Sequence, residues 1–323
     1  MPIRQEYHFM STHPIRFGIA SGQQLYQWAQ LVELWKTADQ LGYDSLWVSD
    51  HLYPILVPNL SESNFEGWTT LSALSQHTNR AKVGALVNCN GFRNPSLTAK
   101  MSATVDHASA GRFILGIGAG WFELEHKSLG FEFKPTPDRL QALDESCRII
   151  KSMFTNDKTN FRGKHYEVID AVCSPKSVQK PRPPLMIAGQ GEKILLRIVA
   201  EHADMWNTQG SPERMRHFIE VMRRHGDKLG RDIDEIEKTV AIPLCYKGSR
   251  EREERATKLA ATLGRTSPEE ARRQMLIGGA DECLDTIEKY SKVGVTHFMF
   301  ASAAPFELDE IRSFAEEVIP QIR

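Results

Sequence analysis

The sequence lacks the features that mark secreted and membrane-spanning proteins. Its five cysteines are scattered over 323 residues without a C-x-x-C pair, which argues against a disulfide framework and favours a reducing compartment. The polar N-terminal stretch has no apolar core of a signal peptide, and no apolar run is long enough to span a bilayer. We therefore expect a soluble, cytoplasmic protein with no membrane partner.

Neither sign of charge is in excess. The 40 Lys and Arg residues nearly balance the 41 Asp and Glu residues, which leaves a net charge of −1. No overall positive field would attract nucleic acid, so we expect no nucleic-acid partner. This balance does not exclude a local basic patch for a phosphorylated ligand.

Several catalytic motifs are missing as well. The sequence has no G-x-S-x-G nucleophile elbow, which argues against an α/β-hydrolase, and no Walker sequence for nucleotide phosphates. Eleven histidines invite a metal site, but none has the spacing of a metal-ligand motif. We therefore expect no metal.

The chain does contain a regular alternation of apolar, strand-like runs and helical patterns. The predicted strands are residues 15–21, 43–50, 81–89, 112–120, 183–189, 205–209, 236–246 and 295–302. They are continuously apolar, as in a parallel sheet covered on both faces, and each is followed by a helix. Eight such units predict an α/β fold of the (β/α)8 TIM-barrel class. The main alternative is a doubly wound open sheet, which usually has about six strands.

Two segments stand outside this repeat. Residues 161–168 (FRGKHYEV) predict a small extended excursion after the fourth strand, and the charged residues 247–275 predict a helical insertion after the seventh. No Pro/Gly/Ser-rich linker divides the chain. We therefore expect residues 1–14 to form an N-terminal extension and residues 15–323 to form one barrel domain.

The glycine run LGIGAGW raises the question of a dinucleotide-binding fingerprint. That motif needs G-x-G-x-x-G in the first strand–helix turn, whereas Gly116, Gly118 and Gly120 alternate on the fourth predicted strand. The run instead predicts a strand end that needs small residues, for close packing, for a positive φ or for the approach of a flat ligand ring. Trp121 then lies at the rim of the barrel, where barrel enzymes carry their active sites.

The second predicted strand ends in Asp50 and His51. A carboxylate and an imidazole at the carboxyl end of a barrel strand are suited to proton exchange near neutral pH. The alternative is a turn or helix cap made by Asp50 beside a merely exposed His51.

The fifth predicted strand ends in the glycine-containing turn 187–191 (IAGQG) and runs into a helix. Free backbone N–H groups and the helix dipole favour an anion at such a place, and Lys193 and Arg197 add positive charge. The alternative is an ordinary strand–helix turn without a ligand.

Taken together, these segments resemble the luciferase-like flavin monooxygenase superfamily. The resemblance spans roughly residues 15–320 and is carried by GYDSLWVSDH, FRNPSLTAKMSATVDHASAGRFILGIGAGWFELEH, FRGKHYEV and PPLMIAGQGEKILLRIVAEHADMWN. The GIGAGW…E form and the lack of a long extra insertion are most similar to the deazaflavin-dependent oxidoreductases, which use coenzyme F420. Luciferase and the alkane monooxygenases of the superfamily use reduced FMN instead.

The resemblance implies a set of cofactor-binding positions. A cis peptide bond not preceding proline, which lies behind the cofactor ring in the family, matches Leu86–Val87, and the phosphate-binding turn matches 188–191. The implied cofactor-binding residues are Leu86, Val87, Asn88, Trp121, Ala188, Gly189, Gln190 and Gly191.

The resemblance also implies catalytic residues, because the Asp-His pair of the dehydrogenase members matches Asp50 and His51. One departure concerns the relatives that place a carboxylate directly after the fourth-strand glycines, where this chain has Trp121. The nearest acids here are Glu123 and Glu125, so that carboxylate is not carried over.

These implications together predict an oxidoreductase that transfers a hydride between coenzyme F420 and a small organic substrate, with His51 and Asp50 handling the proton. An FMN-dependent monooxygenase and a non-catalytic flavin-binding barrel are the alternatives. The substrate wall is expected from the variable loops 23–24, 53–66 and 305–306, which name no substrate. Family members often pair through helices beside strands 2 and 3, so a homodimer is expected.

Overall fold

The computed structural model describes residues 13–57, 59–264, 266–302 and 305–323. Eight parallel strands form a closed barrel, because each pairs with its neighbours and the last pairs with the first. They are β1 (Arg16–Ile19), β2 (Ser45–Val48), β3 (Lys82–Ala85), β5 (Phe113–Gly118), β8 (Leu185–Ala188), β9 (Met205–Thr208), β10 (Glu237–Tyr246) and β12 (Val295–Ala301). Each lies within a predicted run, so the predicted TIM barrel is confirmed.

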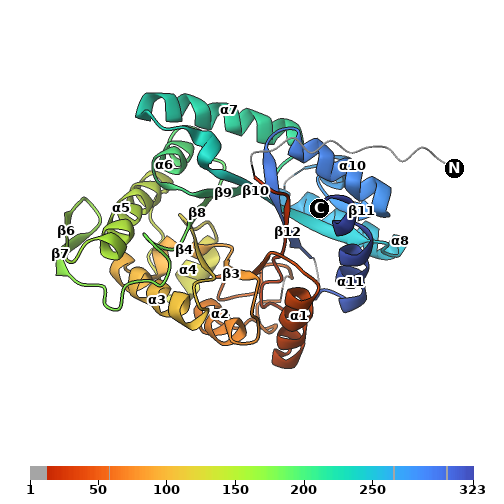
Figure 1. Cartoon of the computed structure of the whole chain (residues 1–323), viewed down its shortest axis with the longest axis horizontal. Coiled ribbons are helices and arrows are strands. Elements are labelled where there is room, and N and C mark those ends of the chain that lie inside the picture. The colour runs from red at the N-terminus through yellow and green to blue at the C-terminus, as the bar shows by residue number, and fades with distance from the viewer. Residues whose placement is uncertain (1–12, 58, 265, 303–304) are drawn as a thin grey trace.

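Helices surround the barrel and cover its outer face (Figure 1). The helices that follow barrel strands are α1 (Trp28–Gln40), α2 (Gly67–Ser75), α3 (Pro95–Ala108), α5 (Thr136–Thr155), α6 (Leu195–His202), α7 (Pro212–Leu229), α10 (Ala280–Ser291) and α11 (Leu308–Glu317). In α3, the Asn94 side chain caps the N-terminus and Pro95 occupies the first turn. A short helix that was not predicted, α4 (Glu123–Leu129), directly follows the glycine run.

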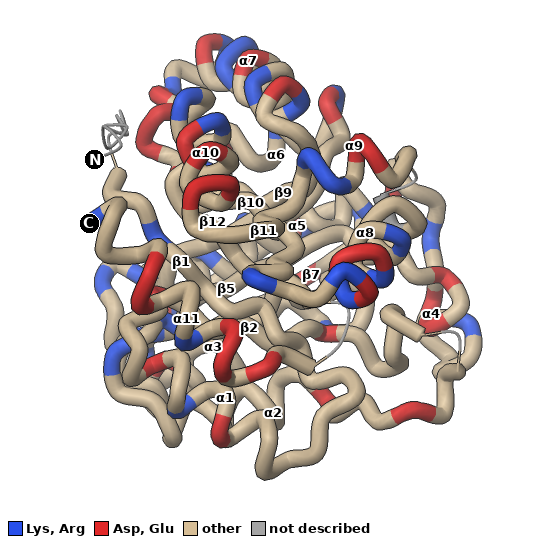
Figure 2. Tube along the Cα trace, turned by 90° about the vertical axis from the view of Figure 1, so that its right-hand side faces the viewer, with Lys and Arg blue, Asp and Glu red and all other residues tan. Residues whose placement is uncertain are grey.

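The two predicted additions to the repeat are also present. The excursion after the fourth barrel strand is an antiparallel hairpin of β6 (Thr159–Arg162) and β7 (Glu167–Ala171), which lies outside α5 in Figure 1. The insertion after β10 contains α8 (Arg250–Gly264) and α9 (Pro268–Arg273). It returns through β11 (Leu276–Gly278), which pairs with the end of β10 and was not predicted. Both signs of charge are interspersed along α7 and α8, whereas α10 is mainly acidic (Figure 2).

The smaller elements are β4 (Asn88–Cys89), which pairs with the end of β5, and three 3-10 turns, η1 (Asn90–Phe92), η2 (Ile233–Glu235) and η3 (Ile319–Gln321). Residues 1–12, most of the predicted N-terminal extension, lie outside the described residues. None of the described helices is both long and apolar enough to cross a bilayer.

Side chains close the barrel interior toward the amino ends of its strands. Trp47, Ile114, Met186, Met205 and Met299 form a buried apolar cluster there. Because this part is filled, space for a ligand remains only at the carboxyl ends of the strands.

Candidate active site

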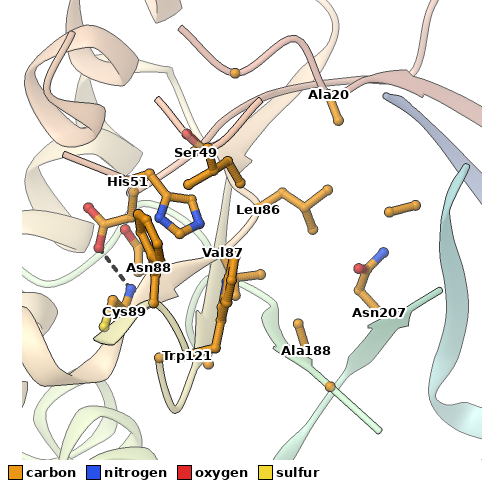
Figure 3. A pocket seen from close by; sticks show the side chains of 18 of the residues that line it. Ala20, Ser49, His51, Leu86, Val87, Asn88, Cys89, Trp121, Ala188 and Asn207 are labelled. Carbon is orange, nitrogen blue, oxygen red and sulfur yellow. Dashed lines mark hydrogen bonds between the residues drawn. The ribbon is translucent and has the colours of Figure 1, made fainter. Parts of the chain in front are cut away.

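A cavity of about 650 Å³ opens at the carboxyl ends of the barrel strands. This volume lies in the range of small-molecule and cofactor sites. Figure 3 shows His51 on one side of the cavity, Ala188 and Asn207 on the opposite side, and Leu86 and Val87 between them. The cavity therefore occupies the rim where barrel enzymes carry out their chemistry.

Nine of the ten residues predicted for the site border this one cavity. They are Asp50, His51, Leu86, Val87, Asn88, Trp121, Ala188, Gly189 and Gln190. The tenth, Gly191, does not line the cavity, because its carbonyl group turns toward the next helix and accepts a hydrogen bond from the Leu196 N–H.

A carboxylate for which the sequence predicted no role, that of Glu125, holds His51. Its Nδ1 lies 3.1 Å from Oε2 of Glu125, whose side chain is only 1% exposed. The other carboxylate oxygen of Glu125 accepts the backbone N–H groups of Leu52 and Tyr53. With Nδ1 engaged, Nε2 is the ring nitrogen left for a ligand, since no described residue reaches it.

Burial by itself would raise the pKa of Glu125. The hydrogen bond and charge of His51, together with the two backbone N–H groups, outweigh burial and bring that pKa below its usual range. Glu125 therefore stays ionised near neutral pH and fixes both the imidazole ring and the start of the loop that follows β2.

Asp50 has different partners from those of His51. Its Oδ2 accepts hydrogen bonds from the Cys89 N–H at 2.8 Å and from Nη1 of Arg93 at 2.7 Å. The same guanidinium group reaches Glu66, which caps α2. No hydrogen bond joins Asp50 to His51, so the two neighbours in sequence border one cavity without forming a pair.

The environment of Asp50 disfavours its charge. Burial raises its pKa above the usual range, and Arg93 and the Cys89 N–H offset this effect only in part. Its Oδ1 is buried without a hydrogen-bond partner among the described residues, as is Oδ1 of Asn88. Two cavity-lining residues thus each carry an acceptor with no protein donor.

The segment after β3 has the backbone geometry that the family resemblance implies. The peptide bond between Leu86 and Val87 is cis. Asn88 follows, and its Nδ2 donates to the carbonyl of Gly116 at 2.7 Å. This segment therefore lies against β5, beneath the cavity.

The alternate glycines of β5 are needed mainly for this close approach. A Cβ at Gly116 would lie 2.2 Å from the Ala85 carbonyl oxygen, and one at Gly118 would lie 3.0 Å from the Val87 side chain. Gly120 has φ +79°, and a Cβ there would approach Sγ of Cys89 to 2.7 Å. Protein atoms fill most of the space beside these glycines, where a ligand ring was one of the predicted occupants. Gly118 and Gly120 still border the cavity.

The turn after β8 differs from its prediction in two respects. It does not run straight into a helix, because α6 begins only at Leu195. Arg197 is not available for a ligand there, since its guanidinium group lies 2.6 Å from Glu201. The cation beside this turn is Arg214 of α7, whose Nη2 donates to Oε1 of Gln190 at 3.0 Å.

Gln190 joins this turn to the next one. Its Nε2 donates to the carbonyl group of Gln209, which follows β9, at 2.9 Å. Gly189 has φ +136° and Gly210 has φ +137°, values that glycine adopts readily and other residues rarely do. The two turns form a glycine-rich edge of the cavity, and Arg214 contacts this edge through Gln190 without lining the cavity itself.

The loops predicted to carry the substrate wall are fastened by two glutamines. Oε1 of Gln24 accepts the backbone N–H groups of Ile55 and Leu56, at 2.6 and 3.3 Å. Gln23 is buried and exchanges two hydrogen bonds of 2.9 Å with the backbone of Ser49, just before Asp50. Gln24 and the two loop residues line the cavity, whereas Gln23 holds the end of β2 in place.

Trp121 is the most exposed aromatic residue of the rim, with 60% of its surface accessible. Its ring meets the His51 ring edge to face, with centroids 5.5 Å apart. An apolar plate therefore stands beside the imidazole at the mouth of the cavity.

One cluster in the described part of the chain has a donor set that suits a metal ion, although no metal was expected. It consists of Asp144, Glu201 and His202 and lies outside the cavity. Arg148 and Arg197 already pair with both carboxylates, so the cluster is a balanced surface ion network.

Comparison with known proteins decides the family. A model of the luciferase-like monooxygenase family matches residues 7–273, which are 267 of the 323 residues. The chain belongs to the luciferase-like monooxygenase family. The F420-dependent glucose-6-phosphate dehydrogenase of Amycolatopsis mediterranei is 24% identical and aligns over 96% of this chain and 99% of its own length. The enzyme of the same name from Microbacterium testaceum is 25% identical, over 97% and 98%.

Several solved structures share the fold. An F420-dependent secondary alcohol dehydrogenase superposes with a TM-score of 0.84 at 22% identity, over 96% of this chain and all of its own. The coenzyme F420-dependent tetrahydromethanopterin reductase of Methanopyrus kandleri gives 0.80 at 20% identity, with the same coverage. A long-chain alkane monooxygenase gives 0.79 at 14% identity, over 96% of this chain and 91% of its own.

Proposed function

We propose that this protein is an oxidoreductase that uses coenzyme F420 and transfers a hydride between it and a small organic substrate. The observation that carries the proposal is the single cavity that joins the His51–Glu125 pair to the glycine-rich edge beside Arg214. The F420-dependent relatives at both the sequence and the structure level support the choice of coenzyme.

The residues present fit such a coenzyme at both of its ends. Asp50 and Asn88 line the cavity, and each carries a side-chain oxygen without a partner among the described residues. These oxygens are able to accept hydrogen bonds from N–H groups like those of a deazaflavin ring. At the other end, Arg214 and the turns at Gly189 and Gly210 suit an anionic phosphate group. Leu86 and Val87 would support the ring from below.

When bound, the coenzyme supplies the site that gives or takes the hydride. The protein then has to manage the proton that accompanies this transfer. His51 exchanges it at Nε2, because Glu125 holds Nδ1 and thereby fixes the direction of the ring. Trp121 and Phe122 shield this side of the cavity from water.

Coenzyme binding is the experiment that tests the proposal. Titration of F420 and, in parallel, of FMN into the purified protein, followed by fluorescence quenching, should give micromolar or tighter binding of F420 only. Micromolar binding of FMN without binding of F420 would overturn the proposal and favour the monooxygenase alternative.

Arg214→Gln removes the cation at the proposed phosphate edge. F420 binding should weaken by roughly tenfold, because one charge-assisted hydrogen bond is lost. The matched control is Arg224→Gln on the exposed face of the same helix, which should bind F420 like the unaltered protein. Equal weakening in both variants would contradict the placement of the phosphate.

A further inference from the structure

Positive charge is scarce along the described lining of the cavity. Among the described residues that line it, none is a lysine or an arginine. Two guanidinium groups contact residues of the lining and are already engaged: that of Arg93, only 14% exposed, lies between Asp50 and Glu66, and that of Arg139 donates to the Gly120 carbonyl. Arg214 lies at the glycine-rich edge, on the side opposite His51.

The ionisable groups among the described lining residues are two acids, two histidines and the Cys89 thiol. Glu125 is ionised and directed at His51, and Asp50 is buried beside it. An anionic group brought next to His51 would lose its hydration, find no positive partner and face two carboxyl groups. Removing an ion from water without a partner is strongly unfavourable.

Apolar side chains contact His51 and line the same cavity. The rings of Trp121 and Phe122 contact the imidazole, and Ile55, Leu56 and Leu86 line the cavity from the loop after β2 and the segment after β3. Apart from the oxygens of Asp50 and Asn88, which the proposed function assigns to the coenzyme, the imidazole Nε2 is the group here that has no partner among the described residues. Such a site fits one hydroxyl or carbonyl oxygen on an otherwise apolar body.

We propose that the substrate is an uncharged, largely apolar alcohol, or the corresponding aldehyde or ketone, and not a sugar phosphate. This inference rests on the proposed function and narrows it, because the curated relatives named above are glucose-6-phosphate dehydrogenases. In the oxidation direction the carbinol carbon gives up its hydride to oxidised F420. The hydroxyl proton goes to His51, and the C–O single bond becomes C=O, so the substrate is oxidised and the coenzyme reduced.

Ligand titration into the F420-loaded protein tests the substrate class. Calorimetric titrations with cyclohexanone, 2-butanone and acetophenone are compared with titrations of glucose 6-phosphate. At least one ketone should bind roughly 100-fold or more tightly than the sugar phosphate. Comparable or tighter binding of glucose 6-phosphate, or binding of none of the three ketones, would overturn the inference.

The two proposals fail in different measurements. Loss of the proposed function appears as absence of F420 binding in the quenching experiment. A wrong substrate class appears in a protein that binds F420 normally but prefers glucose 6-phosphate. Turnover of cyclohexanol, read as reduction of F420, then joins the two results.

A gain of positive charge sharpens the test. Leu56→Arg places a guanidinium group on the wall near His51, and should narrow the ratio of ketone to sugar-phosphate affinity at least about tenfold. Val172→Arg adds the same charge on an exposed position after the hairpin, outside the cavity, and should leave the ratio unchanged. An unchanged ratio in Leu56→Arg would show that missing cations do not set the preference.

Discussion

The two ends of the barrel interior each hold a histidine beside a glutamate. At the carboxyl end, Nδ1 of His51 lies 3.1 Å from Glu125, and at the amino end, Nδ1 of His297 lies 3.3 Å from Glu237. The first histidine is 18% exposed and borders the cavity, whereas the second is 2% exposed. The residue types and distances are nearly the same, but access to a ligand differs, and Nδ1 of His297 makes no hydrogen bond to a described residue.

Protein groups surround the pair at the amino end. Nε2 of His297 lies 2.7 Å from Oγ of Ser45, which also accepts the indole N–H of Trp47. Arg16 pairs with Glu237 at 3.1 Å. A serine, a histidine and a glutamate in this order suggest a hydrolytic relay, but the serine is fully buried. Two features therefore separate a reactive pair from a structural one: access of a ligand to the histidine, and an Nε2 atom without a protein partner. The residue types alone do not distinguish them.

The largest expected effect breaks the pair at the cavity. His51→Ala should lower kcat by roughly 10²- to 10⁴-fold, because general acid–base catalysis of the proton transfer is lost, while F420 binding persists. Steady-state reduction of F420 measures the change. His77→Ala, at an exposed position, is the control and should retain full activity. Full activity of the His51 variant would remove the proton role.

The next effect breaks the other pair and should appear in stability. His297→Ala removes the buried imidazole that contacts both Ser45 and Glu237 and should lower the free energy of unfolding by about 2–4 kcal/mol. Urea denaturation measures this difference. His51→Ala should change the same quantity by less than about 1 kcal/mol. If the two variants lost equal stability, the division of roles between the ends would be wrong.

A third change removes the charge that orients His51. Glu125→Gln should lower kcat by roughly 10- to 100-fold with little change in KM, because the imidazole loses the carboxylate that fixes its direction. Glu123→Gln, on the exposed side of the same helix, provides the control for altering a carboxylate of α4. A loss confined to KM would assign Glu125 to substrate binding instead.

The smallest effect concerns acid stability. Burial would raise the pKa of Glu237, but His297 and Arg16 outweigh burial and bring it below the usual range. The stability from this ionised group is therefore complete above the unfolded pKa of about 4.3 and is lost as pH falls through the lower, folded pKa. Glu237→Gln should make the acid limb of the unfolding free energy shallower, as measured by urea denaturation at several pH values. An unchanged limb would contradict the assignment.

Much of the fold was accessible from the sequence because barrel strands are buried on both faces. Their continuous apolar runs mark all eight strands, and strand ends then indicate which side chains reach the rim, such as His51, Trp121 and Gln190. The position of a side chain relative to the end of its strand thus predicted whether that side chain borders the cavity.

Partners within the site could not be predicted in the same way. Glu125 lies 74 residues from His51 on a seven-residue helix, and Arg214 lies 24 residues from Gln190. These pairs arise only when the barrel closes and brings the ends of different strands to one rim. The sequence likewise could not show that the Ala85 carbonyl fills the space beside Gly116.

The way Gln24 holds the loop after β2 has a consequence for the diversification of this protein. Its side-chain oxygen accepts hydrogen bonds from the backbone N–H groups of Ile55 and Leu56, so these bonds do not involve the side chains of the two residues. Replacement of either side chain therefore alters the chamber without loosening the loop. Positions 55 and 56 are natural choices for a combinatorial library, and sister enzymes that retain Gln24 are free to diverge in what they accept there.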